Sequence, residues 1–416
     1  MSKLLAWRWA RQGLDGSLRG ASAAEVLAQT GWSRSVGGAG PYLALFARAG
    51  LSREQVDGNV AALKIHELPS ARGSTYVVPA EDFSLALRAG HGAPSAAEIA
   101  AAVKFLGVKQ AELDQLGKAV LKALARKPLD PRELKSVLPE GAVRTLGEAG
   151  KKRGQMSTLP LALGALQNEG RIRRVPLDGR LDRQRYAYTP WKLAPLKLSE
   201  EEVDVELARR FFRWAGPATL PQFAWWAGLS QKAARAAVAP LQLVRLAGVS
   251  EPCSLDSSGA EYGDTLPAGD EQLLLPQDLA AFEKFKPPPK PQYALVGSID
   301  NLTHLRRDAA ALLAPEHAGR KLFTDDGPRA GGSLQDLPHH AILDRGQLIG
   351  LWDYDAAEQR IVWASFAKAS PALVKEVERV EAFVTDQLGD ARSFSLDSPE
   401  SRGPRLAALK NLGTPT

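Results

Sequence analysis

Residues 109–191 contain an order of helices and extended segments that few folds use. Apolar spacing and chain breaks predict three helices, in KQAELDQLGKAVLKALAR, RELKSVL and STLPLALGALQNEG. RIRRVPLDGRLDRQRYAY then offers two extended arms around the pair Asp178-Gly179, which is typical of a two-residue hairpin turn. Three helices followed by a β-hairpin is the order of a winged helix-turn-helix.

The same order of elements is found on both sides of this unit. VDVELARRFFRWAGPATLPQFAWWAGLSQKAARAAVAPLQLVRL predicts three helices and a strand, with GPAT and AGLS as the breaks between the helices. Upstream, SREQVDGNVAAL predicts a helix and KIHELPSARGSTYVVP a strand, a turn and a strand. We therefore expect three tandem winged helices, over residues 1–90, 91–197 and 198–253.

The rest of the chain is expected to be a linker and a domain rich in strands. A stretch rich in Ser, Gly and acidic residues, followed by the polyproline-type segment KFKPPPKPQY, predicts a linker over 254–292. The C-terminal domain, 293–416, should open with the strand YALVGSI, continue with a helix near 303–314 and form a small sheet or barrel. An amphipathic helix is expected over 370–388. The predicted fold class is therefore α+β, mainly helical, with a C-terminal β-barrel-like domain.

Composition excludes several classes of protein. With 44% hydrophobic residues the chain is not disordered, and no apolar run approaches the roughly 18 residues that span a bilayer. The start, MSKLLAWRWARQGL, resembles an amphipathic helix more than a signal peptide. The single cysteine, Cys253, excludes an internal disulfide and a cysteine-based zinc site, and the six histidines lack metal-ligand spacing. We expect a cytoplasmic protein with no metal and no cofactor.

Positive charge is concentrated in the middle of the chain. The net charge is +6, but residues 101–200 hold 20 Lys and Arg against 10 Asp and Glu, as a contact surface for a polyanion would. With a two-residue turn, Arg174 falls opposite Arg183, and like charges across a hairpin repel unless an anion such as a DNA phosphate lies nearby. The alternative is a solvated hairpin, partly neutralised by Asp182. The hairpin residues expected to contact DNA are Arg171, Arg173, Arg174, Arg180, Arg183 and Arg185.

Two other groups of polar residues could contact DNA. One group directly precedes the third helix of the middle unit, and the other occupies the polar face of the last helix of the third unit. A solvated helix face would have the same composition, so both interpretations stay open. The residues are Lys151, Lys152, Arg153, Gln231, Lys232 and Arg235.

Three segments resemble one known family, the bacterial tandem winged-helix DNA glycosylases of the AlkZ/YcaQ type. LARRFFRWAGPATLPQFAWWAGLSQKAARAAVAPL is similar to the family's third winged helix, LKIHELPSARGSTYVVPAEDF to its first wing, and VGSIDNLTHLRR to its C-terminal strand and the motif that follows. The resemblance spans nearly the whole chain. It implies three winged helices around a β-barrel-like unit, and excision of alkylated purines, in some members from interstrand crosslinks, by cleavage of the N-glycosidic bond without a metal.

The catalytic signature of that family is replaced in this sequence. The signature, Gln-x-Gln or Gln-x-Asp, precedes an arginine that matches Arg48, and its two polar positions are Arg34 and Val36 here. A glutamine or an aspartate can accept a hydrogen bond from the attacking water, whereas arginine has no acceptor and stays protonated. A guanidinium would also oppose the positive charge that develops on the sugar.

Other residues could take over the chemistry or contact DNA. Ser33 and Ser35 flank Arg34 and could position a water, while Asp82 and Asp300 match acidic positions of the family. Both aspartates are equally expected as caps or braces of turns. Arg34 itself is expected to contact DNA.

Arg72, in the first wing, is also expected to contact DNA.

Three functions are open. The favoured one is a protein that binds duplex or damaged DNA, is related to DNA-repair glycosylases and lacks their signature. The second is an active monofunctional DNA glycosylase with a relocated catalytic group. The third, a winged-helix transcription regulator or scaffold, is disfavoured because no heptad run or ligand-sensing segment is recognisable.

Overall fold

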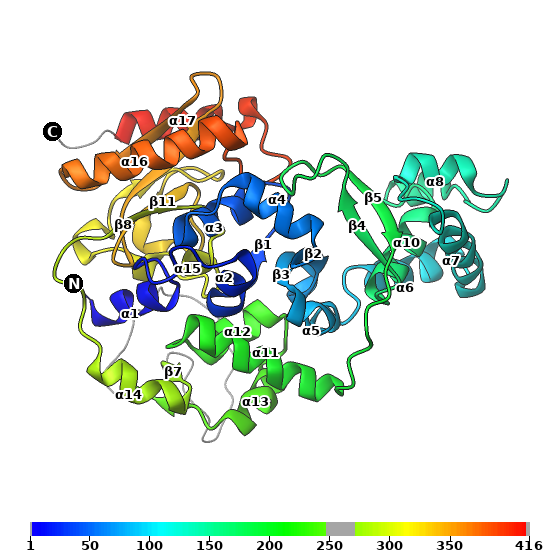
Figure 1. Cartoon of the computed structure of the whole chain (residues 1–416), viewed down its shortest axis with the longest axis horizontal. Helices are drawn as coiled ribbons and strands as arrows, with labels where there is room; N and C mark the ends of the chain where they lie inside the picture. The colour runs from blue at the N-terminus through cyan, green and yellow to red at the C-terminus, as the bar shows by residue number, and fades with distance from the viewer. Residues whose placement is uncertain (1, 247–270, 413–416) are drawn as a thin grey trace.

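The structure is a computed structural model that describes residues 2–246 and 271–412 (Figure 1). Cys253 and residues 254–270 of the expected linker lie outside the described residues. Helices predominate and the strands form several small sheets, which confirms the predicted α+β class. The elements fall into three consecutive units, which we call units one, two and three, and a C-terminal part.

Unit one has the expected order of helices followed by a hairpin, with one additional strand. α2 begins after a capping box at Ser22, and α4 begins after a capping box at Ser52. Its three strands pair antiparallel in the order β1-β3-β2, so that Arg34 lies opposite Tyr76. The elements are α1 (Lys3–Arg11), α2 (Ala23–Thr30), β1 (Ser33–Arg34), α3 (Gly40–Ala49), α4 (Arg53–Ala61), β2 (Ile65–Pro69), β3 (Thr75–Pro79) and α5 (Phe83–Ala89).

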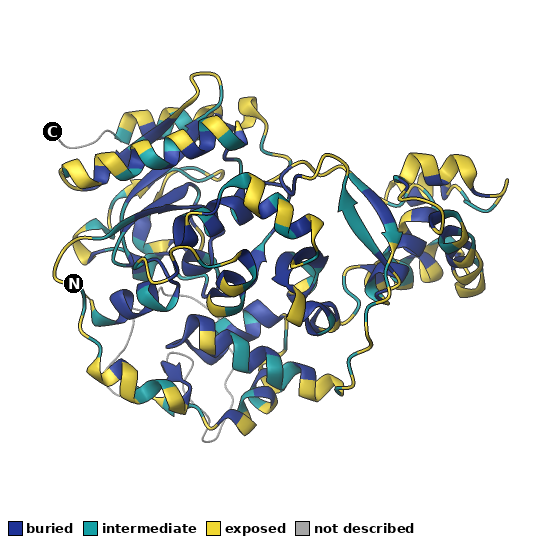
Figure 2. Ribbon diagram, viewed as in Figure 1, coloured by how far each residue is buried: buried dark blue, intermediate teal, exposed yellow. Residues whose placement is uncertain are grey.

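Unit two lies at one end of the molecule and has its own small core (Figure 1). Asp130 caps the short helix α8, and a bridge between Leu129 and Tyr188 extends the hairpin. Figure 2 shows that much of this unit's outer surface is exposed. The elements are α6 (Ser95–Leu106), α7 (Gln110–Leu124), α8 (Pro131–Val137), α9 (Gly147–Lys151), α10 (Thr158–Asn168), β4 (Ile172–Pro176) and β5 (Tyr186–Pro190).

The predicted two-residue turn of this hairpin was wrong. β4 ends at Pro176 and β5 begins at Tyr186, and Arg174 pairs with Tyr188 instead of lying opposite Arg183. The connection, residues 177–185, leaves unit two and reaches the other units (Figure 1), and we call it the docking loop. Tertiary packing therefore overrides the turn preference of Asp-Gly.

Burial explains why the docking loop is long. Leu181 is fully buried in a core formed by unit one and the C-terminal part, and its backbone N–H donates to Tyr42 Oη at 2.9 Å. Arg180 pairs with Asp182 and also donates to the carbonyl oxygen of Leu388. Unit two is thus attached to the rest of the molecule through its hairpin as well as through the chain.

Unit three repeats the order of three helices and a hairpin. Ser199, Thr219 and Ser230 cap the three helices, and the last two of them belong to the predicted GPAT and AGLS breaks. β6 pairs antiparallel with β7 at 273–274, so this unit extends into the stretch predicted as a linker. The elements are α11 (Glu200–Ala215), α12 (Leu220–Ala227), α13 (Gln231–Val238), β6 (Val244–Arg245), β7 (Leu273–Leu274) and, after the hairpin, α14 (Pro276–Lys284).

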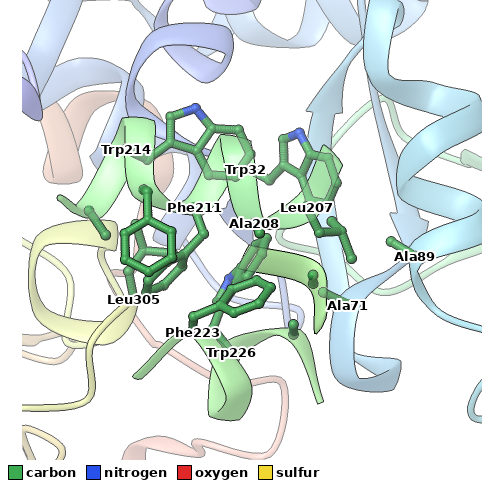
Figure 3. Close-up of a cluster of buried hydrophobic side chains, with 14 of the residues drawn as sticks. Trp32, Ala71, Ala89, Leu207, Ala208, Phe211, Trp214, Phe223, Trp226 and Leu305 are labelled. Atoms are coloured by element: carbon green, nitrogen blue, oxygen red, sulfur yellow. The ribbon is translucent and has the colours of Figure 1, made fainter. Parts of the chain in front are cut away.

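A cluster of tryptophan rings joins units one and three (Figure 3). Trp32 follows α2 of unit one, and its ring centroid lies 5.4 Å from that of Trp214 in α11 and 6.0 Å from that of Trp226 in α12. All three side chains are buried. Burial of such large rings stabilises the contact between units by several kcal/mol, at roughly 25 cal/mol per Å² of apolar surface.

The C-terminal part is built on an open antiparallel sheet, in the order β13-β12-β11-β8, and the described residues contain no closed barrel. Alternate residues face opposite sides: Leu295 and Ile342 pack towards α16 and unit one, whereas Leu343 packs towards α1 and α17. The strands are largely buried (Figure 2). The elements are β8 (Tyr293–Val296), α15 (Asn301–His304), β9 (Lys321–Leu322), β10 (Arg329–Ala330), β11 (His340–Asp344), β12 (Gln347–Asp355), β13 (Arg360–Ser365), α16 (Pro371–Phe383) and α17 (Pro399–Leu412).

The helix expected near 303–314 is much shorter. α15 ends at His304, and Arg307 has a left-handed backbone with φ of 53°, which interrupts a helix. The helix expected over 370–388 is present as α16 and one wider turn to Leu388. Within the described residues, no helix has the length and apolar character needed to cross a membrane.

Candidate functional site

Arg34 lies where unit one meets the C-terminal part. β1 is paired along its length with β3, and the N–H of Ser35 donates to the carbonyl oxygen of Thr75 at 2.9 Å, which extends this pairing. Because side chains alternate along a strand, Arg34 points to one side of β1 while Ser33 and Ser35 point to the other. Strand β1 therefore separates Arg34, the expected DNA contact, from Ser33 and Ser35, the candidates for positioning a water.

The Arg34 side chain enters a cavity of about 250 Å³. Its Nη1 contacts Nε2 of His304, whereas its Nε is buried and has no hydrogen-bond partner among the described residues. This donor could form a hydrogen bond to a ligand that enters the cavity. Further residues that line the cavity are Ser298, Asp325, Asp336, Phe394 and Arg405.

Two more arginines converge beside this cavity. The Arg72 guanidinium lies over the ring of Trp225, 4.2 Å from its centroid, and the Arg307 guanidinium lies 5.2 Å from the same centroid. Burial lowers the pKa of Arg72, and the nearby charges of Arg34 and Arg307 lower it further. We call Arg34, Arg72 and Arg307 the arginine cluster. Its three like charges repel one another, so an anion placed among them would be stabilised.

A histidine and an aspartate complete the site. Nδ1 of His304 lies 3.6 Å from Oδ1 of Asp336, and Oδ2 of Asp336 accepts from Nε of Arg307 at 2.7 Å. Burial lowers the pKa of His304, which outweighs the opposing effect of Asp336. Burial acts to raise the pKa of Asp336, but His304 and Arg307 hold it below its usual value. At neutral pH the pair is therefore a neutral imidazole, with Nε2 facing Arg34, and a carboxylate.

The other residues considered for catalysis are bound elsewhere. Ser35 donates to the buried Glu67 on the far side of β1, and Ser33 is buried. Asp82 accepts from the indole N–H of Trp32 at 2.7 Å and from Arg210. In the second signature position, Val36 uses its carbonyl oxygen to accept from the N–H of Ser395.

Asp300 and Arg48 form a buried ion pair. Both Asp300 oxygens accept from the Arg48 guanidinium, at 2.7 and 2.9 Å, and Oδ1 also caps α15 by accepting from the N–H of Leu302. Arg48 lies in the last turn of α3, the helix that follows the signature segment, so this pair fixes α15 and His304 relative to β1 and Arg34. Asp300 is thus a positioning residue, as the bracing alternative supposed.

Among the residues predicted to contact DNA, Arg180 is not accessible. It is 8% exposed and paired with Asp182, because Leu181 draws the docking loop into the core. Arg173 and Arg174 are partly buried, and the Arg174 guanidinium lies over the ring of Tyr186. The exposed residues are Arg171, Arg183, Arg185, Lys151, Lys152, Arg153, Gln231 and Lys232, with Arg235 partly exposed.

Of all the predicted DNA contacts, only Arg34 lines the cavity, and Arg72 joins it in the arginine cluster. Sequence reasoning missed Trp225, His304, Arg307 and Asp336 as parts of the site. VGSIDNLTHLRR contains two of them, and its resemblance to a family motif was the available signal. Among residues 2–246 and 271–412, no three His, Cys, Asp or Glu side chains gather so that they could hold a metal ion.

The family model described as DNA glycosylase AlkZ-like matches residues 26–383, and the chain belongs to this family. The solved structure of Streptomyces sahachiroi DNA glycosylase AlkZ is similar, with a TM-score of 0.63 and 19% sequence identity over 94% of this chain and 97% of that chain. This likeness shows a shared fold. No curated protein matches the sequence.

Proposed function

We propose that this protein binds duplex DNA, including alkylated duplexes, and that its three units are winged helices serving this purpose. The observation that carries the proposal is the arginine cluster, in which the Nε of Arg34 is buried and has no hydrogen-bond partner among the described residues. The family to which the chain belongs acts on DNA, which supplies the anion that such a cluster needs.

The geometry of the arginine cluster suits a phosphate backbone. Arg72 is held in place by stacking on Trp225, so little side-chain freedom is lost when it binds. A phosphate among the three guanidinium groups would satisfy Arg34 Nε and relieve the repulsion that, together with burial as the larger cause, lowers the pKa of Arg72. The exposed basic residues of unit two and α13 would add sequence-independent contacts along the duplex.

Excision by the family's signature is not expected from this chain. Arg34 and Val36 offer no side-chain acceptor for a water, and the charge of Arg34 opposes an oxocarbenium-like transition state. In this proposal the fold is retained for recognition of DNA, in the cytoplasm and at the nucleoid, with no metal or cofactor required.

A second candidate, an active glycosylase with a relocated catalytic group, is favoured by one observation. The Asp336 carboxylate and the neutral His304 ring both lie in the cavity beside Arg34. Either could accept a proton from water as its oxygen bonds to C1′ and the N-glycosidic bond breaks, the electron pair leaving with the base. The carboxylate would also stabilise the positive charge on the sugar.

One experiment tests both candidates. Duplexes carrying N7-methylguanine are incubated with excess protein, abasic product is revealed with alkali, and binding is measured by fluorescence anisotropy at several salt concentrations. For Arg72→Ala we expect affinity to fall about tenfold and the salt slope by about 1, because one phosphate contact is lost. The matched control, Arg360→Ala, removes an exposed arginine of β13 that pairs with Glu358 and should bind like the wild type.

The outcomes separate the candidates. Wild-type binding with a salt slope near zero, or an Arg72→Ala variant indistinguishable from the control, would contradict the DNA-binding proposal. Alkali-labile product from the wild type that disappears in Asp336→Asn, while binding is retained, would establish the second candidate instead.

A further inference from the structure

Two large apolar side chains are exposed in the segment between α16 and α17. The side chain of Leu396 is 90% exposed and that of Phe394 is 39% exposed, and only one residue separates them in the sequence. We call residues 392–398 the apolar loop. A single exposed leucine is ordinary on a protein surface, so the argument depends on where this pair is held.

The apolar loop is fixed to the segment that carries Arg34. The N–H of Ser395 donates to the carbonyl oxygen of Val36 at 3.0 Å, and the N–H of Ala39 donates to that of Arg392 at 2.8 Å. At Gly38 a Cβ would lie 2.2 Å from the Arg392 carbonyl oxygen, so only glycine allows the two backbones to approach this closely. The loop and the signature segment therefore form one rigid support.

The tip of the loop is also ordered from within. The N–H of Asp397 donates to the carbonyl oxygen of Phe394 at 3.1 Å, and that of Ser398 to the carbonyl oxygen of Leu396 at 2.9 Å. Arg405 pairs with Asp397 and lines the cavity. An apolar tip that is ordered yet left in water is suited to an apolar surface of a partner.

Arginines outnumber carboxylates around the tip: the arginine cluster and Arg405 lie against Asp325, Asp336 and Asp397. Phe394 lines the same cavity as Arg34 and Arg405, and the arginine cluster lies next to it. Two apolar side chains offer far less area than a stable protein interface, which buries about 800 Å² on each partner. Duplex DNA matches both the arginines and the apolar pair, because its phosphate backbone is anionic and its stacked bases are apolar.

We propose that Phe394 and Leu396 form a wedge that inserts between adjacent base pairs of duplex DNA and unstacks them beside the cavity of Arg34. The wedge rests on the proposed DNA binding and adds to it the form of DNA that is recognised. Kinking at the wedge would bring the phosphates next to the unstacked step towards the arginine cluster. Steps that unstack readily, such as mismatched or alkylated ones, would be bound in preference.

Insertion is tested with duplexes that carry 2-aminopurine, whose fluorescence rises when it is unstacked. At saturating protein and low salt, we expect the wild type to raise the fluorescence several-fold. Leu396→Ser, and Phe394→Ser with Leu396→Ser, should give less than half of this rise while anisotropy still reports a bound duplex. The control Val374→Ser changes an exposed apolar residue of α16 and should behave like the wild type.

Failure of the wedge and failure of DNA binding give different results. A double variant that unstacks the reporter as fully as the wild type overturns the wedge, and so does wild-type binding without any rise in fluorescence. Absence of wild-type binding at low salt overturns DNA binding itself. Because Leu396 is almost fully exposed, the single variant should fold normally, and thermal unfolding checks this.

Discussion

At the scale of single residues, the buried pair of Arg48 and Asp300 determines the geometry of the site. Both side chains are 1% exposed, and Gln12 Oε1 accepts a further hydrogen bond from Arg48. Removing one partner of such a pair leaves an uncompensated charge inside the protein. The separation of Arg34 and His304 therefore depends on an interaction that touches neither of them.

We expect Asp300→Ala to lower the free energy of unfolding by about 3–5 kcal/mol, the range for breaking a buried ion pair. Urea unfolding followed by tryptophan fluorescence measures the change. The comparison is Asp326→Ala, whose side chain is 78% exposed and pairs with Arg329 on the surface. If both variants lost the same small amount, Asp300 would not be a brace.

The sequence predicted part of this arrangement. The bracing role was one of two alternatives for Asp300, since an acidic residue before a short helix commonly caps it. The meeting of His304 with Asp336 could not be predicted, because it depends on α15 ending early and on Arg307 adopting a left-handed backbone. Single-residue spacing carries no information about such a contact.

At the scale of elements, the docking loop shows how packing selects one local structure over another. Asp178-Gly179 favours a tight turn, yet the chain continues to Arg185 because Leu181 gains a buried site beside Tyr42. Neither the length of the loop nor its target could be seen from local sequence, since the target is formed by residues far away in the chain.

Leu181→Ala should detach the docking loop. Deleting a buried leucine side chain costs about 2–5 kcal/mol, and the freed loop would expose Arg180, which is buried in the wild type, to trypsin. Limited digestion followed by mass spectrometry should show faster cleavage within 177–185 than in the wild type. Leu177→Ala, at an exposed position of the same loop, should be cut at the wild-type rate; equal rates in both variants would contradict the docked arrangement.

At the scale of the whole molecule, buried histidines make stability depend on pH. Burial lowers the pKa of His304 and His340, and it lowers that of His66 to about 3, with a further contribution from Arg173 and Arg174. The unfolded chain binds these protons near pH 6.5 and the folded chain does not. The free energy of unfolding therefore falls as the pH drops below about 6.5.

The contribution of His66 can be isolated. Its ring packs against Phe83 and Trp191, so phenylalanine should fit the site. Between pH 7.5 and 5.5, the loss of stability in His66→Phe should be smaller than in the wild type by about 1.4 kcal/mol. Urea unfolding at the two pH values measures the difference. An unchanged loss would mean that His66 is protonated in the folded protein, and Val374→Ser serves as the non-titrating control.

Some carboxyl groups act in the opposite direction. Burial raises the pKa of Glu67, so the folded chain binds that proton at a higher pH than the unfolded chain does and gains stability as the pH falls through this range. Comparing His66→Phe with the wild type removes this effect, since both proteins keep Glu67.

The order of helices and strands along the chain was largely predictable from the sequence, whereas their packing and pairing in space were not. Caps, breaks and apolar periodicity are local signals, and most of the helices and hairpin strands that they predicted are present in the same chain order. The open sheet and the extension of unit three to β7 depend on pairing between distant segments. Long-range pairing leaves little trace in a single sequence.

The docking loop also determines which parts of this chain can be exchanged. Tandem units joined end to end suggest modules that could be removed, duplicated or swapped for those of a relative. Unit two, however, places Leu181 inside a core that belongs to unit one and the C-terminal part. A chimera that replaced unit two would have to carry a matching loop. Unit two therefore cannot be exchanged independently of unit one and the C-terminal part.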